Sequence, residues 1–241
     1  MRIGILKCDT VAPALQSAFG DYPDMFRALL GKHRAGWSFR DYDLTAGDFP
    51  DSVAQCDAWL LTGSKWGVHD RDDWILRAHE LAGELYRARR PTVGICFGHQ
   101  LMANALGGRV ERASRVGWGV GVHTAQIRAR RDWMVPARDA LPLLVSHQDQ
   151  VTEPPPGASV LAGHDFCPID MMQIGDHVLT LQGHPEFEVG YSRALMKRRR
   201  AEIGESVFRK GIESLSQPIA PWVATAWISR FMETAHARCA D

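Results

Sequence analysis

The sequence lacks a long apolar run, a closely spaced pair of cysteines and an excess of charge of either sign. The apolar residues Ile3 to Leu6 are interrupted by Lys7 and Asp9, too soon for a secretion signal. No later apolar run reaches the length of a membrane-spanning helix. We therefore expect a cytoplasmic protein that does not enter a membrane.

Charge is evenly balanced, with 28 Lys plus Arg and 28 Asp plus Glu. Proteins that bind nucleic acid or an anionic membrane usually need an excess of positive charge, so neither is an expected partner. The basic run Lys197 to Arg200 is followed by acidic residues and predicts a helix that faces solvent or a protein partner. Small neutral or zwitterionic substrates agree better with this composition.

The cysteines are few, odd in number and scattered: Cys8, Cys56, Cys96, Cys167 and Cys239. Without a CxxC pair they indicate neither a disulfide framework nor a structural zinc site. We expect no metal and no other cofactor, and each cysteine has to be interpreted by itself.

Short apolar segments rich in β-branched residues alternate with longer segments of helical period, as in a mostly parallel sheet flanked by helices. Strands are expected at Arg2 to Lys7, Ala58 to Thr62 and Thr92 to Ile95, and a surface helix within Asp72 to Arg90. The chain has 241 residues, of which 45% are hydrophobic, enough for one substantial core. We predict a single α/β domain over residues 1–241.

The sequence pattern changes near Gly117, where the apolar segments become shorter and extended. These segments predict a smaller antiparallel strand region. These segments are residues 120–128, 143–146, 159–162, 171–174 and 177–182. The prolines of Glu153 to Gly157 predict a surface loop, because proline cannot join a central strand. Residues 189–241 return to helical period and form the predicted helical C-terminal segment.

The strongest local signal is the segment Pro91 to Gln100, in which an apolar strand runs into Gly-Ile-Cys-Phe-Gly and then into a helix. This pattern is typical of a nucleophile elbow, with Cys96 at the turn. The flanking glycines Gly94 and Gly98 allow neighbouring backbone to pass close by. A helix amino terminus favours the thiolate, the reactive form of cysteine. A cysteine in a strand is usually structural, but these features together favour a nucleophile.

An unassisted thiol, with a pKa of about 8.5, is only slightly ionised at neutral pH, so a nucleophilic Cys96 needs a base. The best candidate is His184, which precedes Pro185 and should therefore have extended backbone. Side chains two residues apart on an extended chain point the same way, so Glu186 can orient the imidazole. A lone histidine is more often an ordinary polar residue, and the assignment depends on the companion Cys96 motif.

These segments resemble the class I glutamine amidotransferases. The resemblance rests on Gly94 to Gln100 and on Gly183 to Glu186, with support from Leu61 to Ser64 and Val145 to Val151. It covers roughly residues 1 to 190 and implies a flavodoxin-like α/β fold and a Cys96, His184 and Glu186 triad.

The resemblance also implies an oxyanion hole made of two backbone amides, those of Gly63 and Phe97, which stabilise charge in the tetrahedral state. Many family members have a Gly-Pro-Gly type loop where this chain has Gly63 to Gly67, and this leaves the second donor open.

For the substrate, the resemblance implies that the Gln100 side chain holds the γ-glutamyl group. The backbone of Ser146, His147 and Gln148 would meet its α-amino and α-carboxylate groups. Since the family uses main chain there, the His147 side chain is expected to take no direct part in bond breaking.

The sequence contains no ATP-binding or synthetase segment. We therefore expect a hydrolase that cleaves the γ-amide of glutamine or of a γ-glutamyl conjugate through a Cys thioester, with the conjugate preferred. The alternatives are a glutaminase subunit that supplies ammonia to a separate synthetase, and a glutamine-sensing protein without catalysis. A synthetase or a second copy of the chain remains open as a partner.

Overall fold

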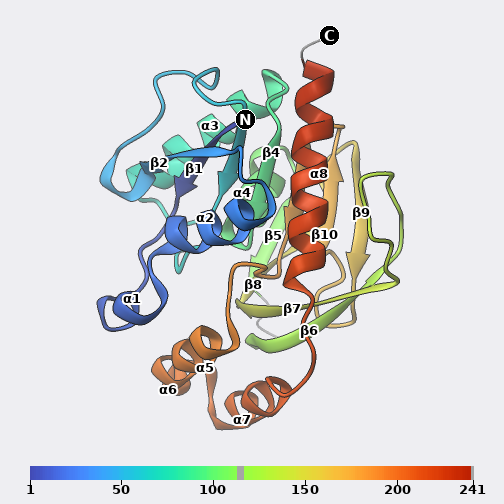
Figure 1. Cartoon of the computed structure of the whole chain (residues 1–241). Helices are drawn as coiled ribbons and strands as arrows, with labels where there is room; N and C mark the ends of the chain where they lie inside the picture. Colours follow the sequence, from blue (N-terminus) through green and yellow to red (C-terminus); the bar gives the residue numbers. More distant parts are fainter. Residues whose placement is uncertain (113–116, 240–241) are drawn as a thin grey trace.

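The computed structural model describes residues 1–112 and 117–239 of the chain. A nine-stranded sheet runs through this part, in the order β2-β1-β3-β4-β11-β10-β9-β6-β7 (Figure 1). Its strands are β1 (Arg2–Lys7), β2 (Ser38–Asp43), β3 (Ala58–Leu61), β4 (Thr92–Ile95), β6 (Gly119–Ile127), β7 (Ala140–His147), β9 (Ala158–Gly163), β10 (Met171–Ile174) and β11 (Val178–Leu181).

The strands from β2 to β11 in this order are parallel, and β10, β9, β6 and β7 continue the sheet with antiparallel pairing. A separate antiparallel pair consists of β5 (Arg109–Arg112) and β8 (Asp149–Glu153). The expected fold class, a parallel sheet flanked by helices with an additional antiparallel region, is confirmed. Four of the predicted antiparallel segments continue the main sheet as β10, β9, β6 and β7. The fifth, residues 177–182, contains β11, which instead pairs in parallel with β4.

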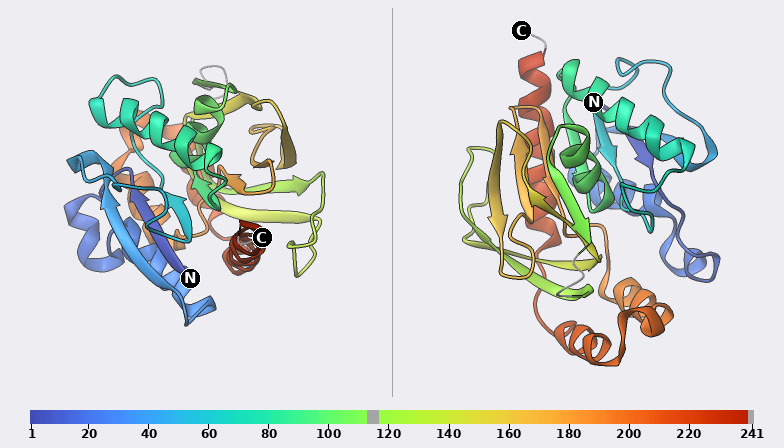
Figure 2. Two further views of the ribbon diagram at one scale, coloured as in Figure 1. Left: turned by 90° about the horizontal axis from the view of Figure 1, so that it is seen from above. Right: turned by 180° about the vertical axis from the view of Figure 1, so that it is seen from behind.

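Helices cover both faces of the sheet. In chain order they are α1 (Pro13–Phe19), α2 (Tyr22–His33), α3 (Asp73–Arg87), α4 (Phe97–Ala105), α5 (Val189–Arg198), α6 (Arg200–Ile203), α7 (Glu205–Ser214) and α8 (Pro221–Cys239), with a 3-10 turn at Leu44–Ala46. Helices α2 and α8 lie on one face, and α3 and α4 lie on the other, as the view from behind shows (Figure 2). The long helix α8 buries Trp227 and Phe231 in the core, whereas Trp222 is 55% exposed.

The three parallel strands expected from the sequence are present, with β3 ending one residue earlier, at Leu61. Strand β2 was not expected, because its sequence Ser-Phe-Arg-Asp-Tyr-Asp is largely polar. It forms the edge of the sheet, where charged side chains reach solvent. The single-domain assignment of residues 1–241 stays a prediction, and residues 240 and 241 lie outside the described part.

Helices α5, α6 and α7 form a helical lobe, residues 189–214, below the sheet in the view of Figure 1. Its apolar side packs on β6 and β7 through Leu195, Met196 and Phe208. None of the helices described is long and apolar enough to cross a membrane.

Candidate active site

Cys96 lies at the turn between β4 and α4, where its backbone has a φ of 52°. A positive φ is unusual for a residue with a side chain and marks local strain. Both flanking glycines are required by packing. A Cβ on Gly94 would lie 2.5 Å from the Gly98 carbonyl oxygen, and a Cβ on Gly98 would lie 2.7 Å from the Leu61 carbonyl oxygen. The close backbone approach predicted for the elbow is confirmed.

The sheet brings His184 to this turn. Strand β11 pairs in parallel with β4, and the Cys96 N–H donates to the Leu181 carbonyl at 2.8 Å. Three residues beyond Leu181, the His184 N–H donates to the Leu144 carbonyl at 2.8 Å. The His184 Nδ1–H donates to Glu186 Oε1 at 2.7 Å, as expected for side chains two apart on an extended chain.

Burial and nearby negative charge shift the pKa of His184 in opposite directions. Burial disfavours the imidazolium, but the negative charge of Glu186 and the interaction with the Cys96 side chain outweigh burial and raise the pKa of His184. The Phe187 ring stacks on the imidazole with centroids 3.8 Å apart. Nδ1 is hydrogen-bonded to Glu186 and Phe187 covers one ring face, so Nε2 is the imidazole atom that can interact with Cys96.

Gly63 lies next to the His184 imidazole and the Cys96 side chain. A Cβ there would be 2.8 Å from His184 Cε1 and 3.5 Å from Cys96 Cβ, so a side chain would displace the imidazole. Within residues 1–112 and 117–239, neither the Gly63 N–H nor the Phe97 N–H donates to a backbone acceptor. The buried carboxylate of Asp9 holds the loop after Gly63, because its Oδ2 accepts the Lys65 N–H at 2.9 Å.

A cavity of about 1110 Å³ opens beside the Cys96 side chain. The substrate-binding residues expected from the sequence all line it: Gln100, Ser146, His147 and Gln148. The structure therefore places the predicted nucleophile and the predicted substrate contacts around one space.

The Gln100 side chain is already fixed by the protein. Its Nε2 donates to the Asp149 carbonyl at 2.7 Å and to Gln182 Oε1 at 3.1 Å. Both N–H groups of the amide are thereby used, which leaves its carbonyl oxygen as the atom able to accept a hydrogen bond from a bound molecule. Gln182, which is fully buried beside the cavity wall, was missed because no motif marks it.

The His147 imidazole is turned into the protein interior. Its Nδ1–H donates to the Asp149 carbonyl at 3.0 Å, and burial lowers its pKa to about 3. A neutral, buried imidazole agrees with the expectation that this side chain takes no direct part in bond breaking.

Another wall of the cavity comes from the helical lobe, which carries no recognised motif. The helical lobe contributes Tyr191, Leu195, Arg198, Arg199 and Glu202. Trp66 lines another side, with its ring edge-on to Trp74 at 5.4 Å and with Lys65 Nζ 4.1 Å from its centroid. Sequence reasoning missed the lobe because no motif marks its residues.

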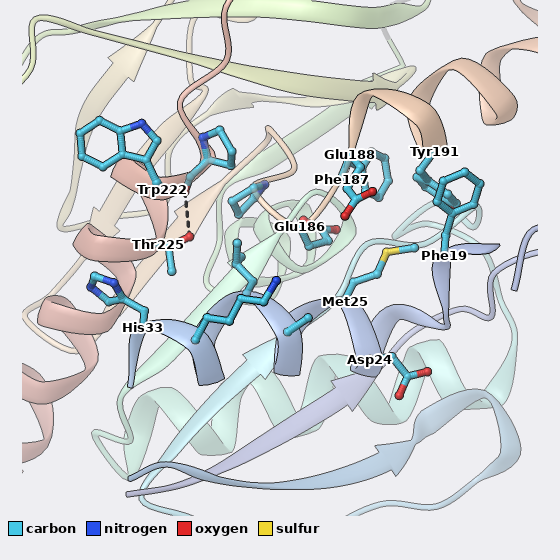
Figure 3. Close-up of a pocket in the computed structure, with 15 residues that line it drawn as sticks. Phe19, Asp24, Met25, His33, Glu186, Phe187, Glu188, Tyr191, Trp222 and Thr225 are labelled. Carbon is cyan, nitrogen blue, oxygen red and sulfur yellow. Dashed lines mark hydrogen bonds between the residues drawn. The ribbon is translucent and has the colours of Figure 1, made fainter. Parts of the chain in front are cut away.

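A smaller cavity of about 580 Å³ adjoins Glu186, between α2, the start of α8 and the segment after β11 (Figure 3). Its walls are mainly apolar and include Met25, Phe187 and Trp222. Cys96 does not line it. This second space therefore meets the proposed triad only through the Pro185–Glu188 segment.

Comparison with known proteins shows the family of this chain. The family model for glutamine amidotransferase class-I matches residues 51–201. Gamma-glutamyl peptidase 5 of Arabidopsis thaliana is 33% identical over 196 residues, which are 77% of this chain and 76% of that protein. Gamma-glutamyl peptidase 3 of the same plant is 32% identical over 184 residues, 72% of each chain.

Solved structures share the fold. A glutamine amidotransferase from Thermotoga maritima superposes with a TM-score of 0.75 at 19% identity, covering 96% of this chain and 98% of the other. One from Methylobacillus flagellatus has a TM-score of 0.72 at 18% identity, covering 96% and 94%. The family match over residues 51–201, which include Cys96 and His184, decides the assignment. The chain belongs to the class-I glutamine amidotransferase family.

Proposed function

We propose that this protein is a cysteine-dependent γ-glutamyl hydrolase that cleaves the amide bond of γ-glutamyl peptides. The observation that carries the proposal is the meeting of a strained cysteine turn with the His184 and Glu186 pair beside a cavity. The γ-glutamyl peptidases among the relatives support this substrate class.

In the first half of the reaction, Cys96 Sγ attacks the γ-carbonyl carbon and its proton passes to His184 Nε2. The raised pKa of His184 makes the imidazole able to take this proton. The carbonyl oxygen becomes an oxyanion that accepts hydrogen bonds from the Gly63 and Phe97 amides. When the tetrahedral intermediate collapses, the C–N bond breaks, the amine takes the proton from His184, and a γ-glutamyl thioester remains.

In the second half, water replaces the amine. His184 Nε2 removes a proton from the water as its oxygen attacks the thioester carbonyl. The C–S bond then breaks, the sulfur recovers the proton from His184, and glutamate leaves. Glu186 orients the imidazole and stabilises its charged form throughout, without transferring a proton itself.

The size of the cavity supports a peptide rather than glutamine as substrate. At about 1110 Å³ it exceeds the roughly 300–1000 Å³ that is usual for a site that binds a drug-sized ligand. Glutamine, which releases only ammonia, would leave much of this space unfilled. The Gln100 carbonyl and the Ser146 to Gln148 backbone would hold the γ-glutamyl half, and the leaving amine would lie along Trp66.

The test compares kcat/KM for γ-glutamylglycine and for glutamine, because this ratio reports differential binding of the two transition states. We expect the peptide to be cleaved faster. Intact-mass measurement after incubation with a γ-glutamyl electrophile should show one adduct, and peptide mapping should place it on Cys96.

Two results would reject the proposal. An adduct on another residue, with Cys96 unmodified, would remove the nucleophile. A preference for glutamine over every γ-glutamyl amide, together with activation by a partner protein, would instead indicate an ammonia-supplying subunit.

A further inference from the structure

The helical lobe places the positive charge of Arg199 in the wall of the cavity beside Cys96. Arg199 lies at the junction of α5 and α6, where its N–H donates to the Leu195 carbonyl and its own carbonyl accepts from the Glu202 and Ile203 amides. The backbone of Arg199 is therefore fixed on both sides. Its side chain is half-buried and lines the same cavity as Cys96.

The described part of the chain satisfies only some of the N–H donors of the Arg199 guanidinium. One N–H donates to Ser146 Oγ at 3.2 Å, and the group lies 5.6 Å from the centroid of the Trp118 ring. Across residues 1–112 and 117–239, no carboxylate lies within ion-pair distance of it. By contrast, the next residue, Arg200, makes two hydrogen bonds to Glu205 at 2.8 and 2.9 Å.

An arginine in this state is suited to a carboxylate ligand. A guanidinium has five N–H donors in a planar fork that matches the two oxygens of a carboxylate. Here the Trp118 ring lies 5.6 Å away and Ser146 occupies one donor, so among the residues that the structure describes the remaining donors are available to a bound anion. Because the side chain is already half-buried and oriented, little conformational entropy is lost on binding.

We infer that Arg199 binds a carboxylate of the substrate and so selects γ-glutamyl compounds over amides without that charge. The inference rests on the proposed function and adds a residue from the helical lobe to its site. The carboxylate has two sources in a γ-glutamyl peptide: the α-carboxylate of the γ-glutamyl half, which the position of Ser146 favours, and the terminal carboxylate of the leaving peptide.

The experiment uses Arg199→Gln and two substrates. γ-Glutamylglycine has both carboxylates, and γ-glutamyl ethylamide has only the α-carboxylate. We expect Arg199→Gln to raise KM by about tenfold to a hundredfold, the usual range for a lost charge-assisted hydrogen bond, while kcat changes little. A rise with both substrates identifies the α-carboxylate, and a rise with γ-glutamylglycine alone identifies the terminal carboxylate.

The matched control is Arg193→Gln, which removes an exposed arginine of α5 that does not line the cavity. It should behave like the wild-type chain. Arg199→Lys should recover part of the loss, since the charge remains but the fork is lost. Unchanged KM in Arg199→Gln with both substrates would overturn the inference, and so would a fall in kcat without a rise in KM, which indicates a structural role.

A binding measurement separates this inference from the proposed function. Titration calorimetry of the full chain with L-glutamate does not depend on turnover. Weaker binding to Arg199→Gln than to the wild-type chain would support the carboxylate contact even if no γ-glutamyl amide were cleaved. Equal affinity in both proteins would overturn it for the α-carboxylate. If the wild-type chain bound neither glutamate nor γ-glutamylglycine, the inference would fall entirely.

Discussion

Two cysteines follow parallel strands of the same sheet, and their surroundings differ sharply. Cys8 comes after β1 and is fully buried, and its thiol donates weakly to the Leu6 carbonyl at 3.4 Å. Burial raises the pKa of Cys8 to about 12. Cys96 comes after β4 and is only 4% exposed, yet it lines the large cavity. Burial of the residue is therefore similar at the two sites.

The difference lies in the turn and in the neighbouring strand. At Cys96 the chain changes direction with a positive φ and enters a helix, and the segment after β11 supplies His184 beside it. At Cys8 the backbone N–H donates to the neutral Thr62 Oγ1 at 3.0 Å. We therefore expect Cys96 to be the reactive thiol, because it has an open side and a nearby base, whereas Cys8 shares only its position at the end of a strand.

The largest expected effect is the difference in lost activity when each of the two cysteines is replaced by alanine. Cys96→Ala should lower kcat/KM for γ-glutamylglycine by about 10⁵-fold or more, because the nucleophile is removed. Cys8→Ala should stay within about twofold and lose about 1 kcal/mol of stability from the small cavity. Steady-state kinetics and circular dichroism on both variants measure this. Equal losses of activity in the two variants would refute the distinction.

A smaller loss of activity is expected when His184 is kept but the charge of Glu186, which orients it, is removed. Glu186→Gln should lower kcat by about 10² to 10⁴-fold, less than Cys96→Ala, because the carboxylate supports His184 without transferring a proton. His184→Ala should resemble Cys96→Ala more closely. If Glu186→Gln were as inactive as Cys96→Ala with its fold intact, the orienting role would be wrong.

The thiols can also be compared without substrate. Because Cys239 is exposed, the measurement uses a Cys239→Ser background. Cys96 should be alkylated by iodoacetamide at neutral pH about a hundredfold faster than Cys8, whose high pKa leaves almost no thiolate. Timed quenching and peptide mapping give both rates. Faster labelling of Cys8 would contradict the comparison.

The smallest expected effect concerns stability at the Cys96 end of the sheet. Burial lowers the pKa of both His99 and His147 to about 3, well below the value near 6.5 of an unfolded histidine. Between these values the unfolded chain binds protons that the folded chain does not. The contribution of these two histidines to the free energy of unfolding should therefore fall as the pH drops below 6.5, by about 1–2 kcal/mol for each histidine at pH 5.

Urea unfolding at pH 7.5 and 5.0 measures this change. His99→Gln should show a smaller loss between the two pH values than the wild-type chain, whereas Cys8→Ala should show the same loss. An equal pH dependence in His99→Gln would mean that this histidine is not held neutral by the fold.

Much of the fold and of the candidate site could be predicted because the signals are local. The close approach required at Gly94 and Gly98 is confirmed, and the spacing of His184 and Glu186 led to the observed hydrogen bond. These features depend on a few neighbouring residues, whose backbone geometry limits where side chains point. The roles of these residues in catalysis stay predictions.

The rest depended on contacts between distant segments. The sequence by itself determined the α/β class, the cysteine turn and the His184 pair, since strand period and turn chemistry act over a few residues. Only the tertiary structure decided that Gln182 and Asp149 hold Gln100, and that the helical lobe carries Arg199 to the cavity. Such contacts join residues 49 or more positions apart, and no local pattern encodes them because packing of whole elements sets their distance.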